Sequence, residues 1–257
     1  MSRPHRVALV TGASSGIGRA LSIELARTGT SRVVCVARRE RELEETAALC
    51  RSAGAAADVV VLDVGDTDAS VARIRAIDAE VGGLDLVVAN AGVGAPRDVR
   101  PYAWEAVRDA LHVNLSGATA TLLAALPAMV DRKRGHVVAI GSLASYGALP
   151  GSIAYCAPKA GLAMVMDCLA LDLAGTGVAS THVRLGFVET PMVAASTHPM
   201  PQLMRADDVA RRLVPRLRRR PHEIVMPRAL AFATRALAAL PEPLRVGALG
   251  SRRVRDL

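Results

Sequence analysis

Short apolar runs, rich in valine, alternate along the chain with longer segments of helical periodicity. Because these runs are almost continuously apolar, they suit strands that are buried on both faces of a sheet. Strands separated by helices imply right-handed crossovers and therefore a parallel sheet with helices on both sides. The pattern predicts a single doubly wound α/β domain over residues 1–257. About seven strands are expected, at residues 6–11, 32–37, 58–63, 84–90, 136–142, 178–185 and 222–227.

The segments between the strands carry the signals of helix ends and loops. The first helical segment, "GIGRALSIELARTG", reaches Gly29, which is placed as a helix stop. Proline and glycine collect in residues 92–101, 147–151 and 190–201, each just after an expected strand. Ligands of open α/β sheets bind outside the carboxyl ends of the strands, so these loops are expected to surround a site.

The length of 257 residues suffices for one large domain with a buried core. The longest apolar runs, near residues 118–130 and 160–174, are interrupted before the roughly 20 residues that a bilayer span requires. The first apolar run has no small-residue cleavage site after it, so it does not indicate a signal peptide. We therefore expect a cytoplasmic protein without a transmembrane segment.

The four cysteines do not form a recognisable framework. Their spacing is irregular, with no CxxC pair and no histidine cluster nearby, which argues against disulfides and against a zinc site. We expect no metal site and interpret the cysteines as buried small residues. They are Cys35, Cys50, Cys156 and Cys168.

The formal net charge of +8 is concentrated in the C-terminal segment. Residues 205–257 hold 13 Lys+Arg against 5 Asp+Glu, whereas residues 1–204 hold 19 of each. Because Phe232 is the only aromatic residue of this basic segment, it lacks the interleaved aromatics of a nucleic-acid binder. No nucleic-acid partner is expected.

Within the basic segment, residues 222–227 and 228–240 predict a last strand and a packed or subunit-interface helix. An apolar stripe is expected on this helix, with Arg228 and Arg235 elsewhere around it. The alternative is a basic amphipathic segment that makes peripheral contact with an anionic membrane. We favour the first interpretation, because charge runs are usually solvated surface. The stripe comprises Leu230, Ala233, Leu237 and Leu240.

A glycine-rich loop, "TGASSGIG" at residues 11–18, follows the first strand and opens the first helix. Backbone amides at a helix N-terminus attract phosphate, and glycine allows a pyrophosphate to approach without an intervening β-carbon. A tight strand-to-helix turn without a ligand is the alternative. The position directly after the first strand favours a nucleotide phosphate.

A tyrosine and a lysine, Tyr155 and Lys159, are four residues apart in "IAYCAPKAG" and share one face of a helix. A phenol has a pKa of about 10 and is a poor acid–base catalyst at neutral pH unless a cation favours its phenolate. Ser142 ends the fifth expected strand, thirteen residues before Tyr155. An exposed helix pair and a strand-end cap are the alternative interpretations of these residues.

These motifs together resemble those of the short-chain dehydrogenases/reductases. The resemblance rests on TGxxxGxG at 11–18, NAG at 90–92, Ser142, YxxxK at 155–159 and "GFVETPM" at 186–192, in the family's order and spacing. It implies a Rossmann-like fold and an NAD(P)(H)-dependent oxidoreductase that interconverts a carbonyl and an alcohol by hydride transfer. The alternative is a catalytically silent protein that senses the cofactor or acts as a scaffold on the same fold.

The resemblance also implies the catalytic roles. Tyr155 is expected to be the general acid/base, and Ser142 to hold the substrate oxygen. Lys159 is expected to lower the pKa of Tyr155 and to contact the nicotinamide ribose. Asn114, in "HVNLSG", is similar to the family asparagine that supports a proton relay.

Further residues are implied to contact the cofactor. Asp63 matches the residue at the adenine, although it could instead be a turn aspartate that caps the next helix, and Asn90 could merely satisfy loop backbone. Leu185 replaces the proline of the family's usual Pro–Gly pair, before Gly186. The implied cofactor contacts are Gly12, Ser14, Ser15, Gly16, Ile17, Gly18, Asp63, Val64, Asn90, Ala91, Gly92, Tyr155, Lys159, Val188 and Thr190.

The end of the second strand indicates which nicotinamide cofactor is used. A carboxylate there would bind the ribose 2′-hydroxyl of NAD, but this chain has Ala37 followed by Arg38 and Arg39. A guanidinium fork suits a phosphate. We therefore assign Arg38 to the 2′-phosphate and expect NADP(H) over NAD(H). The alternative is that both arginines are the solvated start of a charged helix.

The substrate is expected to be small and hydrophobic. Residues 190–204 should form a lid over the substrate, and the part from 193 to 204 is uncharged and contains methionine. With Leu143, Tyr146 and Leu149 nearby, this predicts an apolar pocket for a ketone, an aldehyde or an alcohol. The substrate contacts are assigned to Ser142, Leu143 and Tyr155. A homodimer or homotetramer is implied by the family resemblance.

Overall fold

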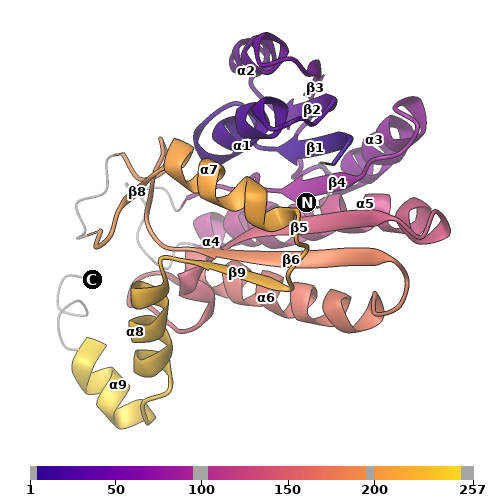
Figure 1. Cartoon of the computed structure of the whole chain (residues 1–257). Coiled ribbons are helices and arrows are strands. Elements are labelled where there is room, and N and C mark those ends of the chain that lie inside the picture. The colour runs from indigo at the N-terminus through magenta and orange to yellow at the C-terminus, as the bar shows by residue number, and fades with distance from the viewer. Residues whose placement is uncertain (1–4, 95–103, 195–199, 250–257) are drawn as a thin grey trace.

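The structure, a computed structural model, describes residues 5–94, 104–194 and 200–249. Seven strands form one parallel sheet in the order β3-β2-β1-β4-β5-β6-β9 (Figure 1). The predicted α/β fold is confirmed. The strands are β1 (Val7–Thr11), β2 (Arg32–Ala37), β3 (Ala56–Val61), β4 (Leu86–Ala89), β5 (Gly135–Ser142), β6 (Val178–Leu185) and β9 (Glu223–Met226).

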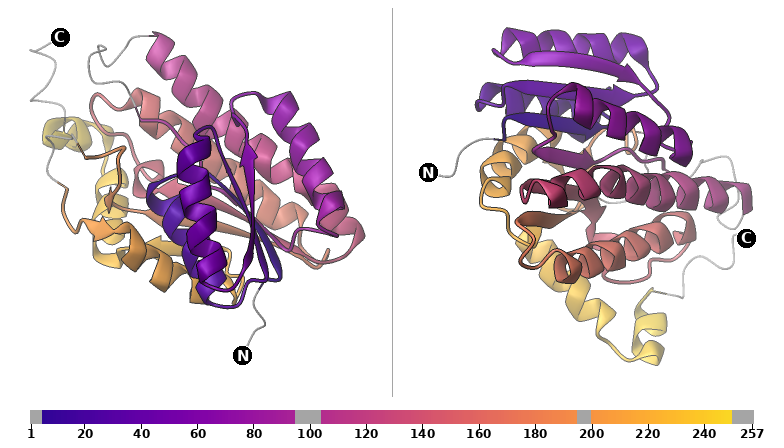
Figure 2. Two further views of the ribbon diagram at one scale, coloured as in Figure 1. Left: turned by 90° about the horizontal axis from the view of Figure 1, so that it is seen from above. Right: turned by 90° about the vertical axis from the view of Figure 1, so that its right-hand side faces the viewer.

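Helices cover both faces of the sheet (Figure 2). One face packs against α1 (Gly16–Arg27), α2 (Glu40–Ser52) and α7 (Ala206–Leu217). The other packs against α3 (Thr67–Glu80), α5 (Ala118–Asp131) and α6 (Ile153–Asp172). The remaining helices are α4 (Trp104–Leu111), which leads through η1 (His112–Gly117) into α5, and the C-terminal α8 (Arg228–Ala238) and α9 (Glu242–Leu249).

The two apolar layers explain why the strands are continuously apolar. Successive side chains of a strand point to opposite faces, so Leu9 and Val10 enter different cores. Both side chains have no exposed surface. A sheet covered on one face would have allowed a polar residue at every second position, whereas here both positions are buried.

The boundaries of the elements agree closely with the predicted ones. Gly29, expected as a helix stop, follows α1 with a φ of +99°, a conformation that glycine adopts without strain. The third strand ends at Val61, two residues before the predicted end. Asp63 therefore lies in the loop after β3 and not within the strand.

Two helical stretches, Trp104–Asp131 and Ile153–Asp172, are by length and composition apolar enough to cross a membrane. This differs from the expectation that polar residues interrupt the apolar runs. Within the most apolar window of each stretch, 50% and 39% of the residues are buried inside the molecule. Packing against the sheet, through α5 and α6, accounts for much of their apolar character.

The expectation that all four cysteines are buried is wrong for two of them. Cys35 on β2 and Cys50 on α2 are buried, because they lie between the sheet and its covering helix. Cys156 is partly exposed and Cys168 is exposed, because they lie on the outer side of α6. All four are free thiols, and no three His, Cys, Asp or Glu side chains gather within residues 5–94, 104–194 and 200–249.

The C-terminal helices extend away from the sheet (Figures 1 and 2). The expected apolar stripe of α8 is only partly confirmed, because Ala233 is exposed and Ala231 is the buried residue of this helix. Leu230 and Leu237 are half-buried, and Leu240 is 38% exposed. Arg235, expected on a part of the helix away from the stripe, contacts Tyr146 and Glu223.

Candidate active site

The strand order reverses between β1 and β4, so the loops after these two strands face a common crevice. The glycine loop, residues 12–18, lies there between β1 and α1. Ser15 is the N-cap residue of α1, but its side chain accepts no capping hydrogen bond. The first amides of the helix therefore lack a side-chain acceptor, which suits a phosphate.

The three glycines of the loop have no space for a β-carbon. A β-carbon on Gly12 would lie 2.8 Å from Nδ2 of Asn90 and 2.9 Å from Cα of Ala91. On Gly16 it would lie 2.9 Å from Cγ2 of Thr190, and on Gly18 it would overlap the carbonyl oxygen of Gly12. The predicted glycine, NAG and Thr190 residues are thus brought together, and the loop fits a dinucleotide phosphate.

Hydrogen bonds tie this loop to the end of β4. The Thr11 hydroxyl accepts from the backbone amides of Asn90, at 3.0 Å, and Ala91, at 3.1 Å. Asn90 Nδ2 donates to the carbonyl oxygen of Thr11 at 2.9 Å. Asn90 therefore does satisfy loop backbone, as the alternative interpretation held, and in doing so it fixes the crevice. Thr11 was not among the predicted site residues, although it begins the TGxxxGxG motif.

Arg39 also holds the glycine loop. Its Nη2 donates to the hydroxyls of Ser14, at 3.0 Å, and Ser15, at 2.9 Å. Arg39 is therefore not merely the solvated start of α2, the alternative that the sequence left open. One sequence does not show that the start of α2 lies over the loop after β1. Arg38 is more exposed and forms an ion pair with Asp63, Nη1 to Oδ2, at 3.5 Å.

Asp63 shapes the turn after β3. Its Oδ1 accepts from the amide of Gly65 at 2.9 Å, while Asp66 is the residue that caps α3, through Ala69 N at 3.0 Å. Val64 is buried, and a β-carbon on Gly117 would lie 2.5 Å from its carbonyl oxygen. Asp63 is thus a turn residue beside the crevice and does not cap the helix.

Asn114 connects a π-helical turn, η1, to the segment after β4. Its Oδ1 accepts from Val93 N at 2.7 Å, and its Nδ2 donates to Val93 O at 2.9 Å. A β-carbon on Gly92 would lie 2.9 Å from Oδ1 of Asn114. The buried amide of Asn114 therefore fixes residues 92 and 93, and a π turn redirects the backbone groups around it.

The three catalytic candidates lie at the carboxyl end of β5. Ser142 is the last residue of that strand, while Tyr155 and Lys159 lie one turn apart on α6. Ser142 Oγ accepts from the amide of Ala144 at 3.1 Å. Lys159 Nζ donates to the carbonyl oxygen of Ile140, two residues before Ser142, at 3.0 Å.

Burial shifts the titration of both groups on α6. It raises the pKa of Tyr155, and a hydrogen bond with Ser142 opposes that shift. It lowers the pKa of Lys159 to about 8. The net shift of Tyr155 is thus opposite to the lowering expected from Lys159. The reason is that α6 removes the phenol from water while the ammonium donates to Ile140 O.

The segment after β6 is held by a small second sheet. Val188 and Glu189 form β7 (Val188–Glu189), which pairs with β8 (Met204–Arg205). Val188 is buried, and a β-carbon on Gly94 would lie 3.2 Å from Cγ of Met192. Both ends of the expected lid, 190–204, are therefore anchored, while residues 195–199 lie outside the described part of the chain.

Leu185 takes the place of a proline without disturbing the sheet. It pairs with Ser142 on one side and with Met226 on the other. The next amide, that of Gly186, donates to Met226 O at 2.8 Å. The strand therefore continues to Leu185, and the turn into the lid begins at Gly186.

The pocket expected around Leu143, Tyr146 and Leu149 is less apolar than its sequence suggested. Leu143 is buried, but Leu149 is 41% exposed. The guanidinium groups of Arg184 and Arg235 lie over the ring of Tyr146, at 4.6 and 4.3 Å from its centroid. Its hydroxyl needs a polar partner when it is partly buried, and Glu223, the first residue of β9, provides one.

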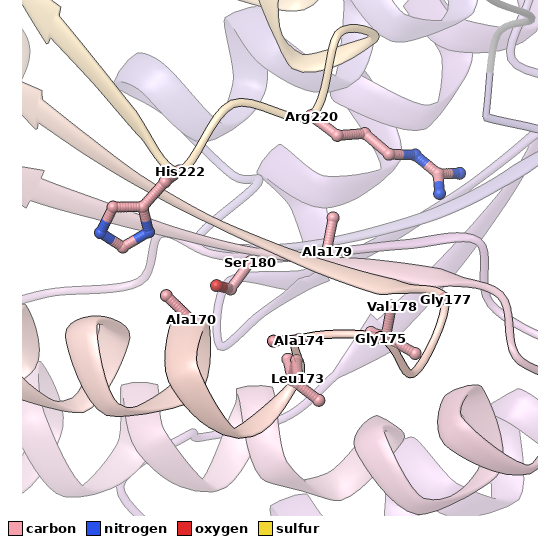
Figure 3. Close-up of a pocket in the computed structure, with 10 residues that line it drawn as sticks. All are labelled: Ala170, Leu173, Ala174, Gly175, Gly177, Val178, Ala179, Ser180, Arg220 and His222. Carbon is pink, nitrogen blue, oxygen red and sulfur yellow. The ribbon is translucent and has the colours of Figure 1, made fainter.

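A separate cavity of about 340 Å³ lies at the opposite end of the sheet (Figure 3). It is bounded by the end of α6, the start of β6 and the segment before β9, and half of its lining residues are alanine or glycine. His222, at its rim, lies 3.3 Å from the carboxylate of Asp167. Since ligands of α/β sheets bind at the carboxyl ends of strands, we place the active site at the other end.

The comparison with known families agrees with this geometry. Over residues 6–201, the sequence matches the family model described as short chain dehydrogenase. The chain belongs to this family. The matched region contains the glycine loop, Ser142 and the Tyr155–Lys159 pair.

Individual relatives of this short chain dehydrogenase are oxidoreductases. An uncharacterized oxidoreductase of Myxococcus xanthus (strain DK1622) is 47% identical over 240 residues, which cover 93% of this chain and 94% of the relative. Estradiol 17-beta-dehydrogenase 11 of Homo sapiens is 30% identical over 239 residues, or 92% of this chain and 79% of that protein. The chain is therefore an NAD(P)-dependent oxidoreductase.

Solved structures share the fold over nearly the whole chain. A short-chain dehydrogenase from Sphingobium yanoikuyae in complex with NADPH has a TM-score of 0.79 and 25% identity, and the match covers 98% of both chains. A short chain dehydrogenase from Mycobacterium paratuberculosis bound to NAD has a TM-score of 0.74 and 25% identity, with 86% of this chain and 95% of that chain covered. The neighbours thus bind nicotinamide cofactors of both kinds.

Proposed function

We propose that this short chain dehydrogenase interconverts a carbonyl compound and a primary or secondary alcohol, with Tyr155 as the general acid/base. One observation carries the proposal. Tyr155 forms a hydrogen bond with Ser142, the last residue of β5, and Lys159 on the same helix donates to Ile140 O of that strand, which supports this role. A hydride acceptor or donor and a proton-transfer group are the two requirements of this reaction.

The side chains divide the proton chemistry between them. A bound nicotinamide cofactor supplies or accepts the hydride. Ser142 Oγ accepts from Ala144 N, and its own hydrogen, which is shared with Tyr155, can be donated to the substrate oxygen instead. Tyr155 gives its phenolic proton to that oxygen in reduction and takes it back in oxidation. Lys159, as an ammonium, stabilises the phenolate and can contact the ribose.

We further propose NADP(H) as the preferred cofactor, bound at the glycine loop. The chain has Ala37 and Arg38 at the end of the second strand, where a carboxylate side chain would repel a 2′-phosphate. Arg38 is exposed enough to turn from Asp63 to a phosphate, since an exposed ion pair contributes only about 0–1 kcal/mol. Arg39 adds a second positive charge beside the loop.

A hydrophobic substrate is proposed from the surroundings of Ser142. Leu143 is buried directly after it, and Met192 of the lid lies close to Gly94. Human estradiol 17-beta-dehydrogenase 11, a relative of 30% identity, carries the name of an apolar alcohol. Oxidation of NADPH against carbonyl compounds from short and polar to long and apolar should show the highest kcat/KM toward the apolar end. Preference for hydroxylated sugars would contradict this choice.

The catalytic proposal is tested by Tyr155→Phe. Removal of the phenolic oxygen should lower kcat by at least about 100-fold, because the acid/base group is lost. The dissociation constant for NADPH, measured by fluorescence titration, should stay within about twofold of the wild-type value. Turnover at the wild-type rate would show that another group transfers the proton.

A further inference from the structure

Arg184 is a buried charge beside the catalytic strand that hydride transfer does not use. It lies on β6, paired in register with Gly141, the residue before Ser142. Its side chain is only 9% exposed. A buried guanidinium is costly unless its hydrogen bonds are satisfied, so its partners indicate what it does.

One arm of Arg184 reaches the backbone of Ser142 through Ser145. Arg184 Nη1 donates to the hydroxyl of Ser145. That hydroxyl in turn donates to the carbonyl oxygen of Ser142 at 2.6 Å. The short turn η2 (Leu143–Ser145), whose Ala144 amide orients the Ser142 hydroxyl, is thereby braced from β6.

The other arm of Arg184 binds Glu223 on β9, Nε to Oε1, at 2.6 Å. The same carboxylate accepts from the Tyr146 hydroxyl at 3.1 Å and from Arg235 Nη2 at 3.0 Å. Burial alone would raise the pKa of Glu223, but the hydrogen bonds from Arg184 and Tyr146 hold it below its usual value. Glu223 therefore remains ionised and keeps Arg184 in place at neutral pH.

The residue of this network farthest from Ser142 is Arg235, which lies on α8. Arg235 on α8 donates to the Tyr146 hydroxyl at 2.6 Å, and its guanidinium lies over the Tyr146 ring, 4.3 Å from the centroid. A β-carbon on Gly147 would lie 2.9 Å from Cβ of Ala238, so α8 also packs on the loop after η2. The network runs from α8 to Ser142 without interruption.

We propose that Arg184 is a positioning residue for Ser142, and that Glu223, Tyr146 and Arg235 fix its orientation from α8. The inference rests on the proposed role of Ser142 as the group that holds the substrate oxygen. Arg184 touches neither substrate nor cofactor in this proposal. It sets the direction of the Ser142 hydroxyl by holding Ser145, and thus the η2 turn, against β6.

The test is a double-mutant cycle with the best carbonyl substrate of the NADPH-oxidation panel. Arg184→Met keeps an unbranched, though shorter, side chain without the charge and leaves Glu223 with two donors, Tyr146 and Arg235. It should lower kcat by about 10- to 100-fold, the effect of misplacing a catalytic group, with NADPH affinity unchanged. In a Ser142→Ala background, the same substitution should change kcat by less than about twofold, because its effect passes through Ser142.

Two further variants separate positioning from general stability. Arg184→Lys should recover part of kcat, because an ammonium can reach one of the two partners but not both. Arg132→Met is the matched control, since Arg132 forms a partly buried ion pair with Asp78, 2.7 Å apart, just before the start of β5, whereas Ser142 ends that strand. It should lower the midpoint of urea unfolding and leave kcat unchanged.

Hydrogen exchange provides a readout that needs no substrate. In the NADPH-bound protein, the amides of residues 143–146 should exchange faster in Arg184→Met than in wild type or Arg132→Met. Unchanged exchange, or an equal loss of kcat in the wild-type and Ser142→Ala backgrounds, overturns the positioning role. Full turnover in Tyr155→Phe would instead overturn the proposed function, so the two failures are distinguishable.

Discussion

Lys159 is one of two lysines in a chain that has 30 arginines. Its Nζ donates to Ile140 O in a site where the residue is only 8% exposed. A compact ammonium fits this space, whereas a planar guanidinium is larger and directs its donors differently. Burial also lowers the pKa of Lys159 to about 8, so this group can change its protonation near neutral pH. An arginine cannot, which gives a physical reason for lysine at this position.

Cofactor preference is a prediction at the residue scale. Arg38→Ala should raise the dissociation constant of NADPH by about tenfold and leave that of NADH within about twofold, because only NADPH carries the 2′-phosphate. Arg39→Ala should weaken both cofactors, since Arg39 holds Ser14 and Ser15 of the common phosphate loop. Fluorescence titration with each cofactor measures both effects.

A matched control for these variants lies further along α2. The side chain of Arg41 is 90% exposed and pairs only with Glu45 among the described residues. Arg41→Ala removes the same charge without touching the loop, so both cofactors should bind as in wild type. Equal losses for NADPH and NADH in Arg38→Ala would show that Arg38 does not contact the 2′-phosphate.

At the scale of elements, the connection from β1 to α1 decides the cofactor site. The loop must turn sharply, approach β4 closely and leave the first amides of α1 available. Gly12 allows both the sharp turn and the close approach to β4, because its φ is +69° and there is no space for a β-carbon. The first amides of α1 remain available to a phosphate. Thr190 packs against Gly16 on the other side of the loop.

Gly12→Ala separates backbone strain from close approach. Gly82 has nearly the same φ, +70°, but a β-carbon there would meet nothing within 4 Å. Both alanine variants should lose about 1–2 kcal/mol of stability in urea unfolding from the left-handed conformation. Only Gly12→Ala should also weaken NADPH binding, by at least about tenfold, because its β-carbon displaces Asn90 and Ala91. Equal NADPH affinity in the two variants would argue against the tight loop.

At the scale of the whole molecule, three buried histidines make the fold sensitive to acid. His136 lies 3.2 Å from His5 and 2.8 Å from the Thr181 hydroxyl, and it has no exposed surface. Neither ring nitrogen of His182 has a hydrogen-bond partner among the described residues. Burial is the largest cause that lowers the pKa of His5 to about 4, of His182 to about 3, and of His136 below its usual value.

Stability should therefore fall as the pH drops from about 6.5 toward 4. In this window the unfolded state binds protons that the buried imidazoles do not accept, so each histidine contributes a slope of up to about 1.4 kcal/mol per pH unit. Urea unfolding at pH 8, 6.5, 5.5 and 5 measures the slope. His182→Met should reduce the slope of stability against pH, because it removes one of the three imidazoles without depriving another described group of a hydrogen bond. A flat stability between pH 6.5 and 5 would show that protonated histidines are accommodated.

The two C-terminal helices, α8 and α9, form an arm whose role also concerns the whole molecule. α9 buries none of its residues, and Leu244 and Val246 are 60% and 57% exposed. Arg235, by contrast, faces the body of the molecule through Tyr146 and Glu223. A subunit interface at this arm therefore stays a prediction, whereas its link to the Ser142 turn is visible in the structure.

Much of the fold was determined by the sequence alone. Continuous apolar runs specify buried parallel strands, because each strand contributes side chains to a core on either side of the sheet. The candidate site could also be read from local spacing. TGxxxGxG and Ser142 lie at strand ends, and Tyr155 and Lys159 lie one helix turn apart. The ranges of the seven strands were predicted within two residues at each end.

Only the tertiary structure decided which polar groups meet. Arg39 reaches Ser14 across 25 residues, and Arg184 reaches Glu223 across 39. Such contacts depend on strand order and register, which a periodic pattern does not specify. Local spacing in the sequence determined the helices, the strands and the catalytic motif. The packing of β6, β9 and α8 brought together the charged cluster of Arg184, Glu223 and Arg235.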